Sequence, residues 1–287
     1  MSNDVLTKIQ AGMSGFSKGQ RLIANYITTS YDKAAFMTAS KLGKTVNVSE
    51  STVVRFAVEL GYDGYPGLQR ALQEMIRNRL TSVQRIEVAN DRIGDQNVLD
   101  TVMHIDMERI RTTMEEIDHA SFDAVVDAIL SARKVYILGV RSSAAIAGFL
   151  DYYLSLMMDN VHLMNTSSTS EVFEQVVRVR EGDLLLGISF PRYSSRTVKA
   201  MEFAHERGAT VVALTDSASS PIAACSDYTL LAKSDIISLV DTLVAPLSVI
   251  NALLVAVGRR KEAELTRTFM DLEQIWDEYE VYEKNEA

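Results

Sequence analysis

Hydroxyl and guanidinium side chains cluster in two loops in the second half of this 287-residue chain. The loops follow two short apolar segments, Val135–Val140 and Leu184–Phe190, and each precedes a helical pattern. The first loop contains Arg141, Ser142 and Ser143. The second contains the polar residues Ser189, Arg192, Tyr193, Ser194, Ser195, Arg196 and Thr197. Because hydroxyls, guanidinium groups and the free N–H groups of a helix start all bind oxyanions, the two loops predict a phosphate site.

Helix capping offers a second explanation for the hydroxyl groups. Serine and threonine often accept hydrogen bonds from the first N–H groups of a helix, and for Ser195 and Thr197 this role alone accounts for the pattern. Capping does not explain why two strand ends carry the same kind of loop. We therefore favour an anion site that both loops form together.

Three side chains near the second predicted strand are candidates for acid–base chemistry. An enzyme that isomerises a sugar phosphate needs a base, and Glu171, Glu174 and His162 lie in this region. Glu171 has the best position, but a glutamate in the first turn of a helix also balances the helix dipole, and we favour that role. His162 fits packing better than catalysis. The four histidines and the single cysteine show no metal-ligand spacing, so we expect no metal and no cofactor.

The N-terminal third contains a pattern typical of DNA-binding helices. A helix over Thr38–Lys44, a turn and a helix over Glu50–Leu60 make a helix-turn-helix, with Ser49 as N-cap and Gly61 just after the second helix. The side chains expected to approach DNA are Lys41, Lys44, Ser49, Ser51, Thr52 and Arg55. Arginine pairs with guanine, hydroxyls bind bases or phosphates, and lysines bind phosphates. The alternative is an ordinary helical hairpin, which exposes the same residue types.

Apolar spacing predicts which faces of these helices are buried. In the helix over Gln20–Thr28 the inward residues are Leu22, Ile23, Tyr26 and Ile27. In the second helix of the helix-turn-helix they are Val53, Val54, Ala57 and Leu60.

The two parts of the chain carry opposite charge. Residues 1–85 contain 11 Lys and Arg against 6 Asp and Glu, a net charge of +5. The remainder contains 18 against 32, a net charge of −14, and the whole chain carries −9. A basic module on an acidic body suits a nucleic-acid binder with a separate sensing domain, because phosphate neutralisation needs local positive charge.

Changes of hydrophobic period indicate the order of elements. The N-terminal third reads as helices, ending with one helix over Leu68–Arg85, and Asp91–Asp95 reads as a polar linker. Ser121 is the expected cap of a helix over Phe122–Ala132. From Val135 to Gly258 short apolar strands alternate with helices, which predicts a parallel sheet covered by helices on both faces.

Composition indicates a folded protein of two domains. The chain is 47% hydrophobic and 23% charged, and its first residues show no signal-peptide pattern. The apolar segment Leu239–Gly258 contains Asp241, Pro246 and Asn251, so we read it as a buried helix and expect no membrane association. With one cysteine and no export signal, a cytoplasmic location is expected.

The alternating strands and helices with their two serine loops resemble the SIS (sugar isomerase) domain, which binds phosphosugars. Together with the helix-turn-helix, the chain resembles an RpiR-type transcriptional regulator over about residues 1–260. The strongest similarity lies in the segments VSESTVVRFAVELGYDGYPGLQ, ILGVRSSAAIA and GISFPRYSSRTVKA. The resemblance implies an N-terminal all-α helix-turn-helix domain followed by a doubly wound parallel α/β domain of the flavodoxin-like type.

The resemblance also implies where the domains and sites lie. We expect a helix-turn-helix domain in residues 1–85, a helical linker in 86–120, the SIS domain in 121–260 and a helical tail in 261–287. The implied phosphate contacts are Ser142, Ser143, Ser189 and Ser194, and the implied DNA-reading helix is Glu50–Leu60. The second loop departs from the usual Ser-x-Ser-Gly-x-Thr pattern of the family, because it is longer and more positively charged.

The implied function is a regulator without enzymatic activity that binds operator DNA near sugar-catabolism genes and responds to a phosphorylated sugar. The alternative is a sugar-phosphate isomerase with an accessory helical domain, in which Glu171 is the base. The family implies a homo-oligomer, a dimer or a tetramer. Apolar residues from Leu265 to Tyr279 continue at helical spacing beyond the α/β domain and support self-association.

Overall fold

The computed structural model describes residues 5–77, 81–94, 97–164, 169–234 and 240–282. These residues form two compact units. The first contains the described residues up to Val102 together with Val240 and Asp241, and the second contains those from Met103 to Ser234 and from Thr242 onward.

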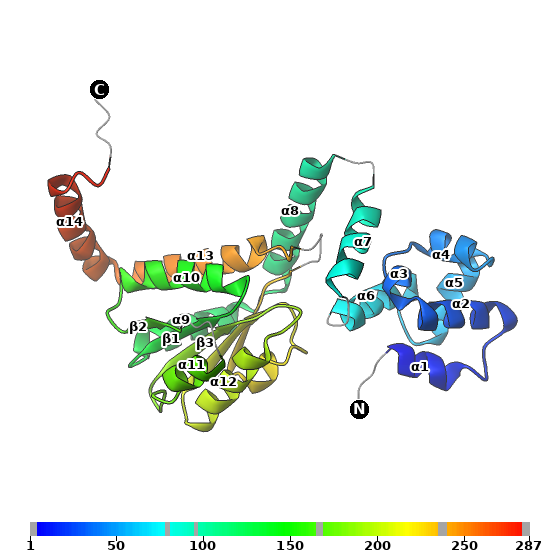
Figure 1. Ribbon diagram of the computed structural model, residues 1–287, viewed down its shortest axis with the longest axis horizontal. Helices are drawn as coiled ribbons and strands as arrows, with labels where there is room; N and C mark the ends of the chain where they lie inside the picture. The colour runs from blue at the N-terminus through cyan, green and yellow to red at the C-terminus, as the bar shows by residue number, and fades with distance from the viewer. Residues whose placement is uncertain (1–4, 78–80, 95–96, 165–168, 235–239, 283–287) are drawn as a thin grey trace. The chain divides into compact units, whose positions relative to one another are not determined.

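The first unit is helical. Its helices in the described residues are α1 (Val5–Gly12), α2 (Lys18–Thr29), α3 (Tyr31–Ala34), α4 (Ala39–Thr45), α5 (Glu50–Glu59), α6 (Gly64–Arg77) and α7 (Ser82–Ile93) (Figure 1). The core forms around the fully buried Phe56, whose ring contacts the ring of Phe16 edge to face at a centroid distance of 5.1 Å. Ile23 and Ile27, one turn apart on α2, are buried against this cluster. The apolar faces of several short helices thus share one core.

Two predicted core residues of the first unit are exposed. Leu22 is 44% exposed and Val54 is 38% exposed, so the prediction was wrong for both. On α5 the buried side chains are Val53, Phe56 and Ala57, and the spacing of three and four residues selects Phe56 rather than Val54 for the inner face.

The predicted single helix over Leu68–Arg85 is two helices. Helix α6 ends at Arg77 and α7 begins at Ser82. Thr81 starts α7 with a capping box, in which its hydroxyl accepts from the Gln84 N–H at 3.3 Å and the Gln84 side-chain oxygen accepts from the Thr81 N–H at 3.0 Å. Such a cap requires non-helical backbone at Thr81, so it interrupts the helix. Part of the predicted linker over 91–95 is also helical, because α7 continues to Ile93 before Gly94 ends it.

The second unit is an α/β domain. Helix α8 (Val98–Glu116) begins in the first unit and continues into the second. The elements that follow are α9 (His119–Ser131), β1 (Val135–Gly139), α10 (Ser143–Ser155), β2 (Val161–Leu163), α11 (Thr169–Val176), β3 (Leu184–Ile188), α12 (Ser195–Glu206), β4 (Thr210–Thr215), the 3₁₀ turn η1 (Ala223–Cys225), β5 (Tyr228–Leu231), α13 (Val244–Arg260) and α14 (Glu262–Glu278).

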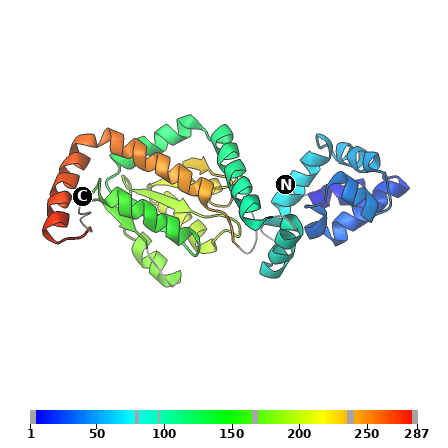
Figure 2. The ribbon, with the colours of Figure 1, turned by 90° about the horizontal axis from the view of Figure 1, so that it is seen from above.

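The five strands form one parallel sheet in the order β2-β1-β3-β4-β5. Alternate residues of each strand face opposite sides, so Ile137 and Leu186 contact the layer of α9, α10 and α13, while Leu138 and Leu185 contact the layer of α11 and α12. Figures 1 and 2 show α10 and α13 on one face of the sheet, and Figure 1 shows α11 and α12 on the other. Burial on both faces explains the continuous apolar strand sequences. The predicted fold class is confirmed.

The start of α9 differs from the prediction. Asp118, not Ser121, caps this helix, and its carboxylate accepts from the N–H groups of Ala120 at 3.2 Å and Ser121 at 3.1 Å. The Ser121 hydroxyl donates to the same carboxylate at 2.6 Å. Asp118 is the better cap than Ser121 because a carboxylate at the start of a helix also interacts favourably with the helix dipole.

No helix among the described residues is long and apolar enough to cross a membrane. The segment that raised this question contains α13, which lies against the sheet with Ile250, Leu253 and Val257 fully buried. The next helix, α14, has no buried residue; its apolar side chain Ile275 is 47% exposed, and its C-cap residue Tyr279 is 72% exposed.

Candidate functional sites

The two serine loops leave adjacent strands at the same edge of the sheet. Strands β1 and β3 are parallel neighbours, and Gly139 pairs with Ile188 at their carboxyl ends. The chain leaves β1 into α10 on one face and β3 into α12 on the other face. This reversal of strand order creates the crevice in which open parallel sheets bind ligands. The structure therefore brings the two predicted loops together at one site.

The first loop presents hydroxyls that capping does not use. Arg141 is exposed and has a left-handed backbone with φ of 58°, and Ser142 is exposed and makes no capping hydrogen bond to α10. Ser143, only 5% exposed, is the first residue of α10. Gly139 allows this close turn, since a Cβ there would lie 2.6 Å from the Ser143 carbonyl oxygen.

The second loop is closed by its own serines. The buried Ser189 hydroxyl accepts from the Ser194 N–H at 3.1 Å. Ser194 is the N-cap of α12 and accepts from the Thr197 N–H at 3.4 Å. Capping was expected of Ser195 and Thr197, but Ser194 takes that role, while Ser195 is exposed on the first turn. The correction follows from geometry, because an N-cap precedes the residues whose N–H groups it receives.

Thr197 has a buried side-chain oxygen in this loop that makes no hydrogen bond within the described residues. Its side chain is fully buried, and its Oγ1 has no hydrogen bond within the described part of the chain. A buried hydroxyl without a partner costs free energy, and a bound ligand that accepts its hydrogen would remove that cost. Arg192 is exposed on the same loop, and Arg196 is half-buried on α12.

The structure adds one residue that the sequence reading missed. Asp216, directly after β4, is 2% exposed, and its Oδ1 accepts from the Tyr193 hydroxyl at 2.8 Å. The signal in the sequence is Thr-Asp-Ser-Ala-Ser-Ser at residues 215–220, a third polar loop after an apolar strand.

The candidate bases lie on and after β2. Glu171 is half-buried in the first turn of α11, which agrees with the dipole role, and Glu174 is exposed on the same helix. His162 is exposed, and its ring lies 5.4 Å from the ring of Tyr136 between centroids. The described residues contain no group of three His, Cys, Asp or Glu side chains arranged to hold a metal ion.

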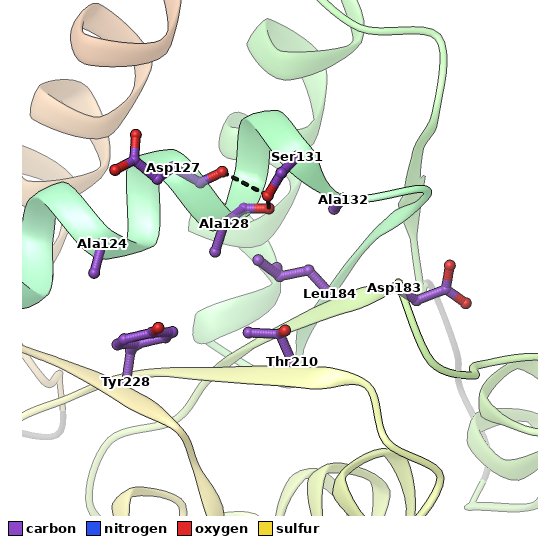
Figure 3. A pocket seen from close by; sticks show the side chains of 10 residues that line it. Ala124, Asp127, Ala128, Ser131, Ala132, Asp183, Leu184, Thr210 and Tyr228 are labelled. Atoms are coloured by element: carbon purple, nitrogen blue, oxygen red, sulfur yellow. Dashed lines mark hydrogen bonds between the residues drawn. The ribbon is translucent and has the colours of Figure 1, made fainter.

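A separate cavity of about 420 Å³ lies at the opposite edge of the sheet (Figure 3). It is bounded by Leu184, Thr210 and Tyr228, the first residues of β3, β4 and β5, and by small side chains of α9. In Figure 3 the Asp183 carboxylate points away from this cavity, and it is held by Arg133 at 2.6 Å. The cavity shares no residue with the serine loops.

In the first unit, α4 and α5 form the predicted helix-turn-helix. Ser49 caps α5 and accepts from the Thr52 N–H at 3.3 Å. Close approach in the turn requires Gly43, since a Cβ there would lie 2.9 Å from the Val48 carbonyl oxygen. Thr38 caps α4 by accepting from the Lys41 N–H at 3.1 Å. The motif is therefore held by two hydroxyl caps and one glycine.

The predicted DNA-contacting side chains lie on α4, on α5 and at the N-cap of α5. Lys41 and Lys44 are exposed on α4, and Ser51 and Arg55 are exposed on α5. Thr52 is half-buried, and its hydroxyl lies 2.8 Å from that of Ser49. The Arg55 Nε donates to the Ser51 carbonyl at 3.4 Å, which directs the guanidinium along the N-terminal half of α5. Hydroxyls and a guanidinium at the start of an exposed helix suit contact with base edges and phosphates.

Comparison with known proteins matches both units. Residues 3–79 match the helix-turn-helix domain of the rpiR family, and residues 128–256 match the SIS domain. The chain is an RpiR-type regulator. The RpiR-type chain is similar to an HTH-type transcriptional regulator of Haemophilus influenzae. The two are 28% identical over 235 residues, which cover 80% of each protein. It is 23% identical over 268 residues, 92% of this chain and 94% of the relative, to an HTH-type transcriptional regulator of Caldanaerobacter subterraneus.

Solved structures agree with this assignment. The sugar isomerase domain of an RpiR transcription factor from Sphaerobacter thermophilus superposes with a TM-score of 0.60 at 28% identity, covering 62% of this RpiR-type chain and 99% of that one. The Vibrio vulnificus NanR protein, solved in complex with ManNAc-6P, superposes with a TM-score of 0.59 at 21% identity and covers 96% of this chain and 99% of its own. At 21% identity the second likeness concerns the fold alone. The predicted family is confirmed.

Proposed function

We propose that this RpiR-type chain binds operator DNA through α5 and that a phosphorylated sugar, bound between the β1 and β3 loops, changes its DNA affinity. The fully buried Thr197 hydroxyl, unpartnered within the described residues beside the serine loops, is the observation that carries the ligand site. The complex of NanR with ManNAc-6P supports this class of ligand. The proposed contacts are Arg141, Ser142, Ser143, Ser189, Arg192, Ser194, Ser195 and Thr197, with Glu171 beside them.

The DNA interface consists of Lys41, Lys44, Ser49, Ser51, Thr52 and Arg55. As in the sequence analysis, we assign residues 1–85 to DNA binding, 86–120 to a helical linker, 121–260 to the SIS domain and 261–287 to a C-terminal tail. The exposed apolar side chains of α14 support self-association into a dimer or tetramer. A regulator of this kind acts in the cytoplasm, where its operator lies.

Anisotropy titrations against DNA fragments upstream of the chain's own operon test the DNA function. Specific binding should weaken with salt, by about 0.9 logarithmic units of affinity per logarithmic unit of salt for each phosphate contacted. Arg55→Ala should reduce specific affinity by about tenfold. The matched control is Arg178→Ala, an exposed arginine of the second unit outside both the DNA interface and α14. Absence of specific binding under all conditions would refute the proposal.

The same titrations with hexose 6-phosphates and N-acetylhexosamine 6-phosphates test the ligand function. At least one should shift the DNA affinity, because a ligand that prefers one of two arrangements must change their populations. Ser189→Ala should abolish the shift and leave DNA affinity without ligand unchanged.

We propose that the chain is not an enzyme. The curated relatives are named as transcriptional regulators, which supports this reading. Incubation with aldose and ketose phosphates, followed by NMR, should show no interconversion. Turnover that disappears in Glu171→Gln would instead establish the isomerase alternative.

A further inference from the structure

The β3–α12 loop alternates buried and exposed residues over a short distance. Phe190 is 6% exposed and packs into the sheet core, and Pro191 is also buried. Arg192 is exposed, and Tyr193 and Ser194 are half-buried. The loop therefore needs attachments close to Arg192 if this guanidinium is to keep one position.

One attachment comes from within the loop, because Ser194 donates its N–H to Ser189. The other comes from a different strand. Asp216 follows β4, and its Oδ1 accepts from the Tyr193 hydroxyl at 2.8 Å and from the buried Thr215 hydroxyl at 3.4 Å.

Asp216 is a rigid anchor for this contact. Strand β4 pairs with β3 on one side and β5 on the other, so its carboxyl end is fixed by two ladders of hydrogen bonds. At 2% exposure the carboxylate depends on hydrogen-bond donors, since an unpaired buried charge is costly. Tyr193 supplies one of these donors from the neighbouring strand's loop.

We propose that Asp216 is a positioning residue of the phosphosugar site, which acts through Tyr193 to hold the β3–α12 loop in its ligand-binding conformation. This inference rests on the proposed function and concerns how the site reaches its affinity. Asp216 does not touch the phosphate. It fixes the loop before the ligand binds, so the entropy cost of ordering the loop does not reduce the free energy of binding.

Isothermal titration calorimetry of the full chain tests the proposal, with inorganic phosphate and the sugar 6-phosphate that binds the wild type as probes. Tyr193→Phe removes only the hydroxyl and should raise the Kd for both probes by about tenfold. Asp216→Leu should do the same, whereas Asp216→Asn keeps an acceptor oxygen and should stay within about threefold of the wild type. A double variant that combines Tyr193→Phe with Asp216→Leu should be no weaker than either single variant.

Two further measurements separate positioning from general stability. Trypsin cleaves after arginine, so cleavage at Arg192 without ligand should be faster in Tyr193→Phe than in the wild type, because the loop loses its attachment to β4. The control is Ser219→Ala, whose hydroxyl pairs with Ser217 in the same loop as Asp216. It should leave both Kd and cleavage unchanged.

The outcomes distinguish this inference from the proposed function. If the wild type binds sugar phosphates and Tyr193→Phe binds them equally well, positioning is refuted and the proposed function survives. If Asp216→Asn is as weak as Asp216→Leu, the charge itself is required and the tyrosine contact is not the reason. If the wild type binds no sugar phosphate at all, the proposed function fails and this inference fails with it.

Discussion

Thr197 illustrates how a single buried hydroxyl can mark a binding site. Its Oγ1 lacks a partner among the described residues, whereas the equally buried Thr215 donates to Asp216 at 3.4 Å. The two threonines therefore form a matched pair for mutation, because the same change removes a satisfied hydroxyl at one position and an unsatisfied one at the other.

We expect Thr197→Val to stabilise the ligand-free protein by about 1 kcal/mol, because valine preserves the shape and removes the desolvated hydroxyl. The same variant should weaken phosphosugar binding. Thr215→Val should instead destabilise the protein by a similar amount. Urea unfolding and calorimetry measure the two effects, and a loss of stability in Thr197→Val equal to that in Thr215→Val would show that the hydroxyl is satisfied in solution.

Tyr65 gives the first unit a pH dependence at high pH. It is 4% exposed, its hydroxyl donates to the Met37 carbonyl at 2.7 Å, and burial raises its pKa from 10.0 to about 12. The unfolded chain therefore loses this proton at a lower pH than the folded chain.

The stabilisation from Tyr65 is fully present below pH 10, the unfolded pKa, and is lost as the pH rises through the folded pKa of about 12. We expect about 2 kcal/mol of the free energy of unfolding to disappear by pH 12. Tyr65→Phe should be less stable at neutral pH but should lack this part of the decline. Denaturation monitored by circular dichroism between about pH 8 and about pH 12 compares the two proteins.

At the scale of elements, the approach of α10 to β1 depends on Gly139. A Cβ at this position would lie 2.6 Å from the Ser143 carbonyl oxygen and 2.9 Å from the Ala147 Cβ. Gly139→Ala should therefore push the start of α10 away, cost about 1 to 3 kcal/mol of stability and weaken phosphosugar binding.

The matched control is Gly148→Ala, also at α10, where a Cβ meets nothing within 4 Å. It should raise stability by up to about 1 kcal/mol, because alanine favours helix. Thermal unfolding and calorimetry of both variants provide the measurement. Unchanged ligand affinity in Gly139→Ala would mean that the first loop does not contribute to the site.

Most elements could be predicted because the spacing of apolar residues and the length of each apolar segment distinguish buried strands from helices. The predicted apolar segments Val135–Val140 and Leu184–Phe190 contain the strands β1 and β3, which begin at the predicted residues and end one and two residues earlier. The break before α7 was also readable, since Thr81 and Gln84 have capping-box spacing, but a continuous apolar stripe concealed it. Val54 lies beside the buried face of α5 and is 38% exposed, whereas the fully buried Phe56 belongs to that face.

The site was predicted only as far as its loops. Serines at strand ends are visible in the sequence, and parallel strands bring their carboxyl ends together. The Tyr193–Asp216 contact was not predictable, because it joins residues 23 positions apart and depends on β3 and β4 being neighbours. No local pattern contains that information.

At the scale of the whole molecule, one ion pair involves residues far apart in the sequence. Arg85 on α7 is 4% exposed, and its Nη1 lies 2.7 Å from the Asp241 Oδ1. Helix α7 is also joined to α3, where Gln84 donates to Asp32 at 3.2 Å. Asp241 groups with the first unit, although the next residue, Thr242, groups with the second and donates to Asp106 of α8 at 2.6 Å.

We expect Asp241→Ala to loosen α7 more than Arg85→Met does. Removing the carboxylate takes one hydrogen-bonded anion from a buried guanidinium that cannot lose its charge, whereas removing the arginine leaves an aspartate with 19% of its side chain exposed. Hydrogen–deuterium exchange of α7 measures the difference. Equal exchange in both variants would show that the guanidinium is not desolvated in solution.

This pairing bears on how the protein can be divided for experiments. A fragment that stops at residue 85, or at any point before Asp241, lacks the carboxylate that pairs with Arg85 at 2.7 Å. An isolated N-terminal fragment would then unfold more easily than the same helices do in the intact protein. The melting temperature of such a fragment would be lower than that of the helix-turn-helix domain in the intact protein. A longer fragment would restore the ion pair only if it extended past β5 and included Asp241.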